Sequence, residues 1–193
     1  MTHTPPVDEA VPYRLPQTPA DRTAVPPQTL TCVISSQLRP DDRQALLDLF
    51  DRSSPQTRHQ RFHHGLSVFP QRYLDDIVSG RQLALVARDT CHPDSYGKVF
   101  GLASAAPTGN GEAEFAVWVD DAWQGRGLGT LLVRSILQRL AQAGTAAAIG
   151  FMQPDNVAIR RLVRKVAPES SFRTEDDMIV VRIPLAGPHA WQR

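Results

Sequence analysis

The sequence lacks the features of several classes of protein. None of its apolar runs approaches the roughly 18 residues of a membrane-spanning helix, and its first residues contain no signal-peptide core. The formal net charge is only +1, so no global field draws the chain to nucleic acid or to an anionic membrane. We therefore expect a cytoplasmic protein whose partners are neither nucleic acid nor a membrane.

Cysteine and recognisable metal ligands are also scarce. The two cysteines, Cys32 and Cys91, lie far apart and form no Cys-x-x-Cys pair, which is typical of a reducing compartment. His63 and His64 are adjacent, so they cannot share a helix face as two ligands four residues apart can. These observations predict neither a disulfide framework nor a metal site.

Proline is unevenly distributed. Seven of the 16 prolines fall within residues 1–28, a segment with few apolar residues to bury. This composition predicts an extended, flexible tail over residues 1–28. We expect a single domain over residues 29–186, followed by a short C-terminal tail at 187–193.

The spacing of apolar residues predicts the elements of that domain. Strands are expected at residues 30–36, 82–88, 98–106, 113–120, 146–152 and 177–185. Helices are expected at residues 40–50, 69–78, 128–142 and 156–166. This order predicts an α/β (α+β) fold in which helices cover both faces of a mixed sheet.

The most informative stretch is the strand, turn and helix over residues 113–142. Three glycines, Gly125, Gly127 and Gly129, occupy every second position of the turn. Glycine permits positive φ angles and close approach of a ligand to the main chain. The first turn of a helix offers N–H groups without partners and a partial positive charge, and Arg126 adds a permanent cation. The stretch therefore predicts an anion site, with phosphate the usual ligand.

The turn is similar to a known cofactor loop. A dinucleotide-binding loop would need glycine or alanine at Thr130, and a nucleoside-triphosphate loop would need a Gly-Lys-Ser/Thr run, which is absent. Residues 124–129 instead resemble the acetyl-CoA loop of the GNAT N-acetyltransferase superfamily, Gln/Arg-x-x-Gly-x-Gly/Ala. Gln124, Gly127 and Gly129 stand at its defining positions. The resemblance implies acetyl-CoA as the cofactor.

The resemblance covers about residues 30–185 and looks strongest to the acetyltransferase domain of bacterial protein lysine acetyltransferases. The stretches that carry it are residues 49–58, 113–117, 123–129, 154–156 and 161–165. It implies a GNAT-like, twisted, mostly antiparallel sheet and direct transfer of an acetyl group to a primary amine, with a protein lysine as the leading acceptor. The alternatives are a small amine as acceptor, or a degenerate module that senses acetyl-CoA and acts through partners. A monomer and a dimer both remain open.

The same resemblance implies roles for individual residues. Glu114 corresponds to the general base that relays the proton of the amine, although a strand glutamate alone is more often a solvated residue. Glu112 is the second candidate, and Asp120 and Asp121 are weaker ones. Main-chain N–H groups near the thioester are expected from Val117, Trp118 and Val119, and a pantetheine contact from Asn156. The remaining cofactor-binding residues are expected to be Gln124, Gly125, Arg126, Gly127, Leu128, Gly129 and Thr130.

Two positions depart from the family pattern, and the role of one segment has two possible interpretations. Val163 replaces the tyrosine that often protonates the departing thiolate, so the resemblance supplies no general acid. Val166 and Ala167 replace the usual Gly-Phe pair. The basic and aromatic segment 53–69 corresponds to the region that lines the acceptor groove in such enzymes, but it is equally well explained as a solvated face.

Overall fold

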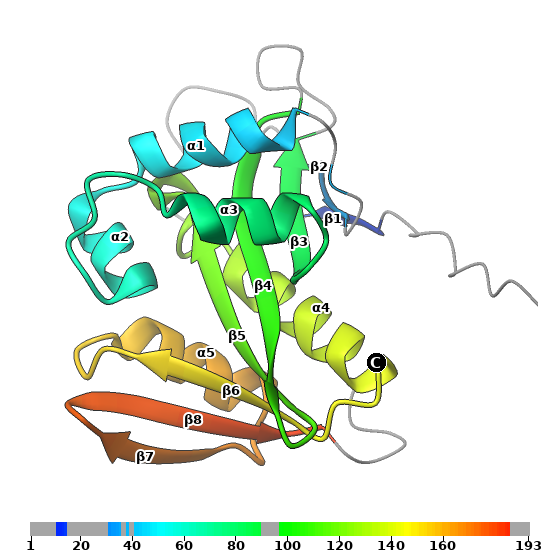
Figure 1. Ribbon diagram of the computed structural model, residues 1–193, viewed down its shortest axis with the longest axis vertical. Helices are drawn as coiled ribbons and strands as arrows, with labels where there is room; N and C mark the ends of the chain where they lie inside the picture. The colour runs from blue at the N-terminus through cyan, green and yellow to red at the C-terminus, as the bar shows by residue number, and fades with distance from the viewer. Residues whose placement is uncertain (1–10, 15–30, 36–37, 39–40, 90–96, 186–193) are drawn as a thin grey trace, which may run out of the picture.

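The computed structural model describes residues 11–14, 31–35, 38, 41–89 and 97–185, which form a sheet flanked by helices (Figure 1). Its strands are β1 (Val11–Arg14), β2 (Thr31–Ser35), β3 (Leu83–Asp89), β4 (Val99–Gly109), β5 (Glu112–Val119), β6 (Ala147–Met152), β7 (Ser171–Glu175) and β8 (Met178–Pro184). Its helices are α1 (Asp42–Arg52), α2 (Pro55–Phe62), α3 (Gln71–Val78), the short 3-10 helix η3 (Asp121–Trp123), α4 (Leu128–Gln142) and α5 (Val157–Val166).

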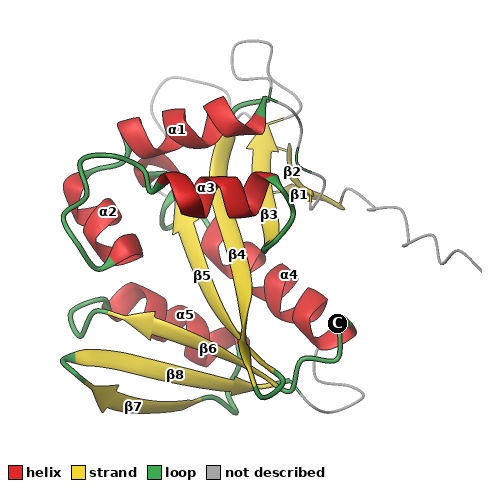
Figure 2. Cartoon of the chain, in the orientation of Figure 1, coloured by secondary structure: helices red, strands yellow, loops and turns green. Residues whose placement is uncertain are grey.

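The strand order in the sheet is β1-β2-β3-β4-β5-β6-β8-β7, and only β5 and β6 run parallel. Helices lie on both sides of the strands (Figure 2). The predicted α/β fold with a mixed, mostly antiparallel sheet is therefore confirmed. Among the described residues, no helix has both the length and the apolar character needed to span a bilayer.

Two hydrophobic cores hold the layers together, one on each face of the sheet. The larger core joins the sheet to α4 and α5, and the smaller joins it to α1 and α3. Strand β5 contributes to both because its side chains alternate: Phe115 belongs to the larger core and Trp118 to the smaller. Glu114 and Ala116 consequently lie on the same face as Trp118, which is the face covered by α1 and α3.

The sheet opens in its middle. The pairing of β5 with β6 extends only over Glu112, Ala113 and Glu114, which face Ala147–Ile149, whereas β4 follows β5 as far as Val119. Beyond Glu114 the two strands diverge, and Figure 1 shows β6, β8 and β7 turned away from β3, β4 and β5. Helix α2 lies on the side where the ends of β5 and β6 separate.

The structure corrects the prediction in three places. Val11–Arg14, predicted as tail, forms the edge strand β1 against β2, where Pro12 interrupts no central ladder. Helix α2 and strand β7 were not predicted at all. The rest of the proline-rich tail, the loop at 90–96, and the proposed boundaries at 29 and 186 with the C-terminal tail lie outside the described residues.

Candidate active site

The glycine-rich turn has the conformation that its sequence predicts. Gly125 and Gly127 have φ angles of 71° and 91°, which residues with a side chain rarely adopt. Helix α4 begins directly after Gly127, which supplies no side-chain cap. The N–H groups of the first turn are therefore left for solvent or a ligand, and the helix dipole favours an anion there.

Strand β5 presents a second set of main-chain donors. The N–H of Asp120 donates to the carbonyl of Phe100 on β4, 2.9 Å away. Because hydrogen-bonding directions alternate along an antiparallel strand, the N–H of Trp118 is directed toward β4, and those of Val117 and Val119 are directed toward the gap beside β6. These two N–H groups thus point away from β4 along the open edge of β5, beyond its described pairing with β6.

A cleft of about 700 Å³ joins these two sets of donors. Its walls come from α2, the far half of β5, the glycine-rich turn, the end of β6, and α5. The predicted site residues that line it are Glu114, Val117, Trp118, Val119, Gln124, Gly125, Arg126, Gly127, Gly129, Thr130 and Asn156. Leu128 does not line it, because its side chain is fully buried in the larger core. Of the groups of Leu128, only the main-chain N–H is left to contact a ligand in the cleft.

Several of these residues also have structural roles. A Cβ added to Gly129 would lie 3.2 Å from a methyl group of Leu162, so this glycine also permits α4 to pack against α5. The Trp118 indole is 2% exposed and donates to the Ser53 hydroxyl at 3.1 Å. Asn156 caps α5, its side-chain oxygen accepting the N–H of Ile159 at 3.1 Å. The predicted cofactor contact of Asn156 stays a prediction.

Arg126 is oriented by an aromatic ring. Its guanidinium lies over the ring of Trp123, 5.4 Å from the centroid, and Trp123 in turn packs on Phe100 with 4.4 Å between ring centroids. A cation held over an aromatic face is fixed without losing its charge. Arg126 therefore strengthens the positive potential at the N-terminus of α4.

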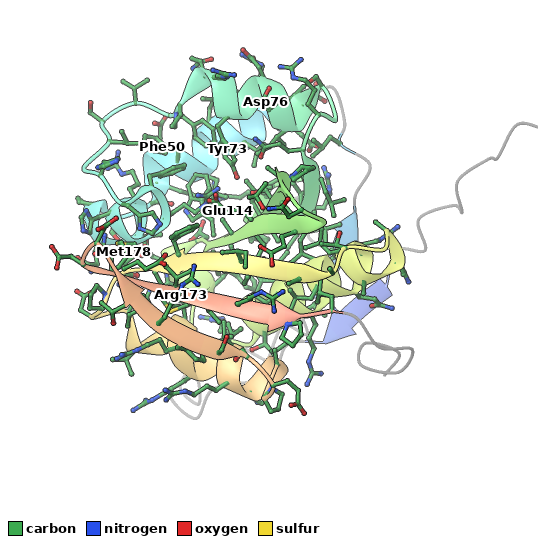
Figure 3. All side chains as sticks on the ribbon, turned by 60° about the horizontal axis from the view of Figure 1, so that its bottom comes forward. Phe50, Tyr73, Asp76, Glu114, Arg173 and Met178 are labelled. Carbon is green, nitrogen blue, oxygen red and sulfur yellow. The ribbon has the colours of Figure 1, made fainter. Side chains whose placement is uncertain are left out.

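The structure separates the four candidate carboxylates. Glu112 is paired with Arg182, with 3.0 Å between Nε and Oε1, and Asp120 is paired with Arg52. Asp121 accepts hydrogen bonds from α2. Glu114 is exposed and lines the cleft, and its carboxylate makes no hydrogen bond or ion pair with any residue that the structure describes. Of the four carboxylates, Glu114 is thus the one that lines the cleft without a partner among the described residues. Figure 3 shows it on β5.

Asp121 connects the glycine-rich turn to α2. Its Oδ2 accepts the N–H of Ser54 at 2.7 Å, and its Oδ1 accepts the hydroxyl of Thr57 at 2.6 Å. Gln124 donates to the Thr57 hydroxyl at 3.0 Å and to the Val119 carbonyl at 3.2 Å. Burial raises the pKa of Asp121, but the hydrogen bonds from Thr57 and Ser54 outweigh it and hold the pKa below its ordinary value. Asp121 is therefore ionised near pH 7, and its carboxylate holds Ser54 and Thr57.

Helix α2 is the wall that the sequence did not predict. Ser54 caps it by accepting the N–H of Thr57, Pro55 occupies its first turn, and it ends at His63 with a φ angle of 60°. A serine followed by proline is a helix-start signal that would have identified it. Thr57, Arg61 and His63 line the cleft, so the segment whose role was left open does face the site.

His63 is the most unusual residue of this wall. Its Nδ1 is buried and has no hydrogen-bond partner within the described part of the chain. Burial lowers the pKa of His63 below its ordinary value of 6.5, and Arg61, His64 and His59 lower it further. The imidazole is therefore neutral near pH 7, and it is a potential hydrogen-bonding group for whatever enters the cleft.

Known proteins share this architecture. The sequence profile described as the Acetyltransferase (GNAT) family matches residues 44–167. An acetyltransferase of Pseudomonas aeruginosa is 31% identical over 134 residues, which is 67% of this chain and 71% of that protein. The GNAT domain of S. lividans PAT superposes with a TM-score of 0.66 at 18% identity, covering 81% of this chain and 92% of that one. An N-acetyltransferase of Thermoplasma acidophilum in complex with coenzyme A superposes with a TM-score of 0.60 at 13% identity, covering 80% of this chain and 99% of that one.

The opened sheet, the glycine-rich turn before α4 and the cleft between them define an acyltransferase-type site. The chain belongs to the GNAT acetyltransferase family, and it is an N-acetyltransferase.

Proposed function

We propose that this protein transfers the acetyl group of acetyl-CoA directly to a primary amine, and that the amine is a protein lysine side chain. One observation carries the proposal. The unpaired carboxylate of Glu114 lies in the same cleft as the N–H groups of β5 and the N-terminus of α4. One cleft therefore contains a carboxylate that can accept a proton, N–H groups that can donate hydrogen bonds to an acyl oxygen, and a helix N-terminus that favours an anion.

The residues present fit acetyl-CoA. Its pyrophosphate suits the positive end of α4, where Gly127 leaves the first-turn N–H groups uncapped and Arg126 stands beside them. We assign the N–H groups of Val117 and Val119 the role of donors to the acyl oxygen, and one such donor is worth about 2.7–4 kcal/mol in a transition state. Bound acetyl-CoA supplies the thioester, whose acyl group is activated toward nitrogen.

Glu114 accounts for the proton of the amine. A lysine with a pKa of about 10.4 is protonated at pH 7, and freeing its nitrogen costs roughly 4.6 kcal/mol. Glu114 accepts this proton, directly or through water, before the nitrogen attacks. As the N–C bond forms and the C–S bond breaks, the nitrogen loses a second proton, which passes through water to solvent or to the departing thiolate. Val163, fully buried beside the cleft, has no proton to give, so the thiolate leaves unassisted or takes a proton from water.

Support for a lysine acceptor comes from resemblance. The segment 49–58 and the helix after residue 156 resemble those of bacterial protein lysine acetyltransferases, and the PAT domain shares the fold. A small amine is the competing acceptor.

The test is acetyl transfer by the purified protein. Coenzyme A release is followed with a thiol reagent in the presence of lysine peptides, protein substrates and small amines, and the acetylated atom is located by mass spectrometry. We expect release that depends on the amine and a modified lysine Nζ. Release no faster than without any amine would contradict the proposal.

A further inference from the structure

Arg61 is a permanent cation fixed on the α2 wall of the cleft. Its guanidinium carbon lies 4.8 Å from the ring centroids of both Phe62 and Tyr73. Its Nη2 donates to the Tyr73 hydroxyl, which lies 2.8 Å from the hydroxyl of Ser104 on β4. Two aromatic rings and a hydroxyl pair therefore hold one charged group in place, and arginine cannot lose its charge by deprotonation.

No carboxylate of the described residues balances this charge. Arg61 is in none of their ion pairs, and Glu114 is the only acid among those that line the cleft. Helix α2 has no aspartate or glutamate, whereas His63 at its end adds a buried Nδ1 without a partner. This wall thus presents a permanent cation and an unpartnered ring nitrogen, which donates in the tautomer that carries its proton on Nδ1, but no carboxylate. An anion would satisfy them, and guanidinium groups bind carboxylate and phosphate especially well.

The position of Arg61 relative to Glu114 limits the shape of such a ligand. Ser104, at the base of the Arg61 cluster, is paired across the sheet with Ala116, and Glu114 is two residues from Ala116 on the same face. Diagonal neighbours of this kind have side chains about 7–8 Å apart. Figure 3 shows Glu114 on β5 on the side of the sheet covered by the helices that carry Phe50 and Tyr73. If the amine of an acceptor lies at Glu114, a second group of the same molecule, a few bonds from the amine, would lie toward Arg61.

We propose that Arg61, with His63 beside it, is a subsite for an anionic group of the acceptor, a carboxylate or a phosphate close to the amine. The proposal rests on the proposed function. In a protein acceptor, the group is an aspartate or glutamate next to the modified lysine; in a small acceptor, it is the acid of an ω-amino acid. The cation repels acceptors whose neighbouring groups are basic.

The experiment compares acceptors that differ only in charge. One pair is a short peptide with lysine beside glutamate and the same peptide with glutamine; the other is an ω-amino acid and its amide. We expect kcat/KM for the acid of at least one pair to exceed that for its neutral partner by about tenfold or more, since the amide oxygen of the neutral compound accepts a weaker hydrogen bond without the attraction between opposite charges. Preference within the peptide pair identifies a protein acceptor, and preference within the other pair a small one.

Variants assign the preference to Arg61. Arg61→Gln is expected to reduce the ratio of kcat/KM for the acid to kcat/KM for its neutral partner to about one. Arg61→Lys is expected to keep part of this ratio. Arg72→Gln, the same change at an exposed position of α3 outside the cleft, is expected to keep the full ratio. If Arg61→Gln fails to fold, Tyr73→Phe removes only the hydroxyl that holds Arg61 and is expected to lower the ratio.

Two results would count against the proposal in different ways. Equal kcat/KM for acid and neutral compounds, or a ratio unchanged in Arg61→Gln, would overturn the subsite and leave acetyl transfer intact. Absence of transfer to every amine, with or without an acid, would overturn the proposed function and the subsite with it.

Discussion

The two walls of the cleft are built by different means. The wall that we assign to the cofactor consists of main-chain N–H groups on β5 and α4, arranged by strand pairing and by the left-handed conformation of Gly125 and Gly127. The opposite wall, α2, is attached through side chains, chiefly Ser54 and Thr57 bonded to Asp121. A site made of main chain depends little on side-chain identity, whereas a wall held by a few side-chain bonds can change its position and chemistry by single substitutions.

The largest effect is expected on the main-chain wall, from Gly127→Val. A φ angle of 91° is strained for a β-branched residue by about 1–3 kcal/mol, and the new side chain would obstruct approach to the turn. We expect acetyl-CoA affinity to fall by about a hundredfold or more, which corresponds to the loss of about 2.7 kcal/mol of hydrogen bonding. Calorimetric titration of folded protein measures this. The control is Gly65→Val, where an added Cβ meets nothing within 4 Å; equal affinities of the two variants would contradict the assignment.

Glu114→Gln tests the carboxylate between the walls. We expect kcat to fall by about 10²–10⁴-fold, the usual contribution of a general base, with unchanged acetyl-CoA affinity. Glu112→Gln is the matched control, because Glu112 lies two residues earlier on the same face but is paired with Arg182. Steady-state kinetics decide the matter: wild-type turnover in the Glu114 variant would remove this residue from the mechanism.

A smaller effect is expected from Asp121→Asn on the side-chain wall. The amide cannot accept all the hydrogen bonds that Ser54 and Thr57 donate, so α2 should be held less firmly. We expect KM for the amine to rise about three- to tenfold, in line with one or two lost hydrogen bonds, and acetyl-CoA affinity to stay the same. Asp51→Asn, on the exposed surface of α1, serves as control. A change in acetyl-CoA affinity without a change in KM for the amine would contradict this prediction, because Asp121 would then act on the main-chain wall and not on α2.

The smallest effect concerns pH and stability. The pKa of His63 is below 6.5 in the folded protein, so the unfolded chain binds more protons once the pH falls below about 6.5. Stability from the neutral imidazole is therefore present above that pH and is lost as the pH decreases, with a slope below about 1.4 kcal/mol per pH unit. His63→Asn, a residue that tolerates positive φ, is expected to gain stability relative to wild type between pH 7 and pH 5. Urea unfolding at both pH values measures the difference, and a constant difference would contradict the account.

The same contrast explains what could be predicted from the sequence. The turn and its two flanking elements are contiguous, so Gly125, Gly127 and the alternation along β5 predict the main-chain wall locally. Its anion-binding character follows from helix physics, and the specific cofactor required resemblance to a family. Leu128 shows the limit of this reading, because its side chain is buried in the larger core and only its main-chain N–H is left for a ligand.

The side-chain wall depends on contacts between distant segments. Thr57 and Asp121 are 64 residues apart, and Glu112 and Arg182 are 70 apart. No local pattern shows that Asp121 is occupied by hydrogen bonds or that Glu112 is paired, so residue spacing alone could not reduce the candidates to Glu114, which only the family resemblance singled out. Helix α2 and the β7–β8 hairpin did have local signals: serine before proline, and two aspartates at a tight turn with φ angles of 44° and 64°.

The most direct test of the account is thermal unfolding with and without acetyl-CoA at about a hundred times its dissociation constant. Binding at that level adds roughly 2.7 kcal/mol, so we expect the Tm to rise by about 5–10 °C with acetyl-CoA and to stay unchanged with NAD or ATP. No rise with acetyl-CoA would contradict the claim that the opened edge of β5 and the N-terminus of α4 form its binding site.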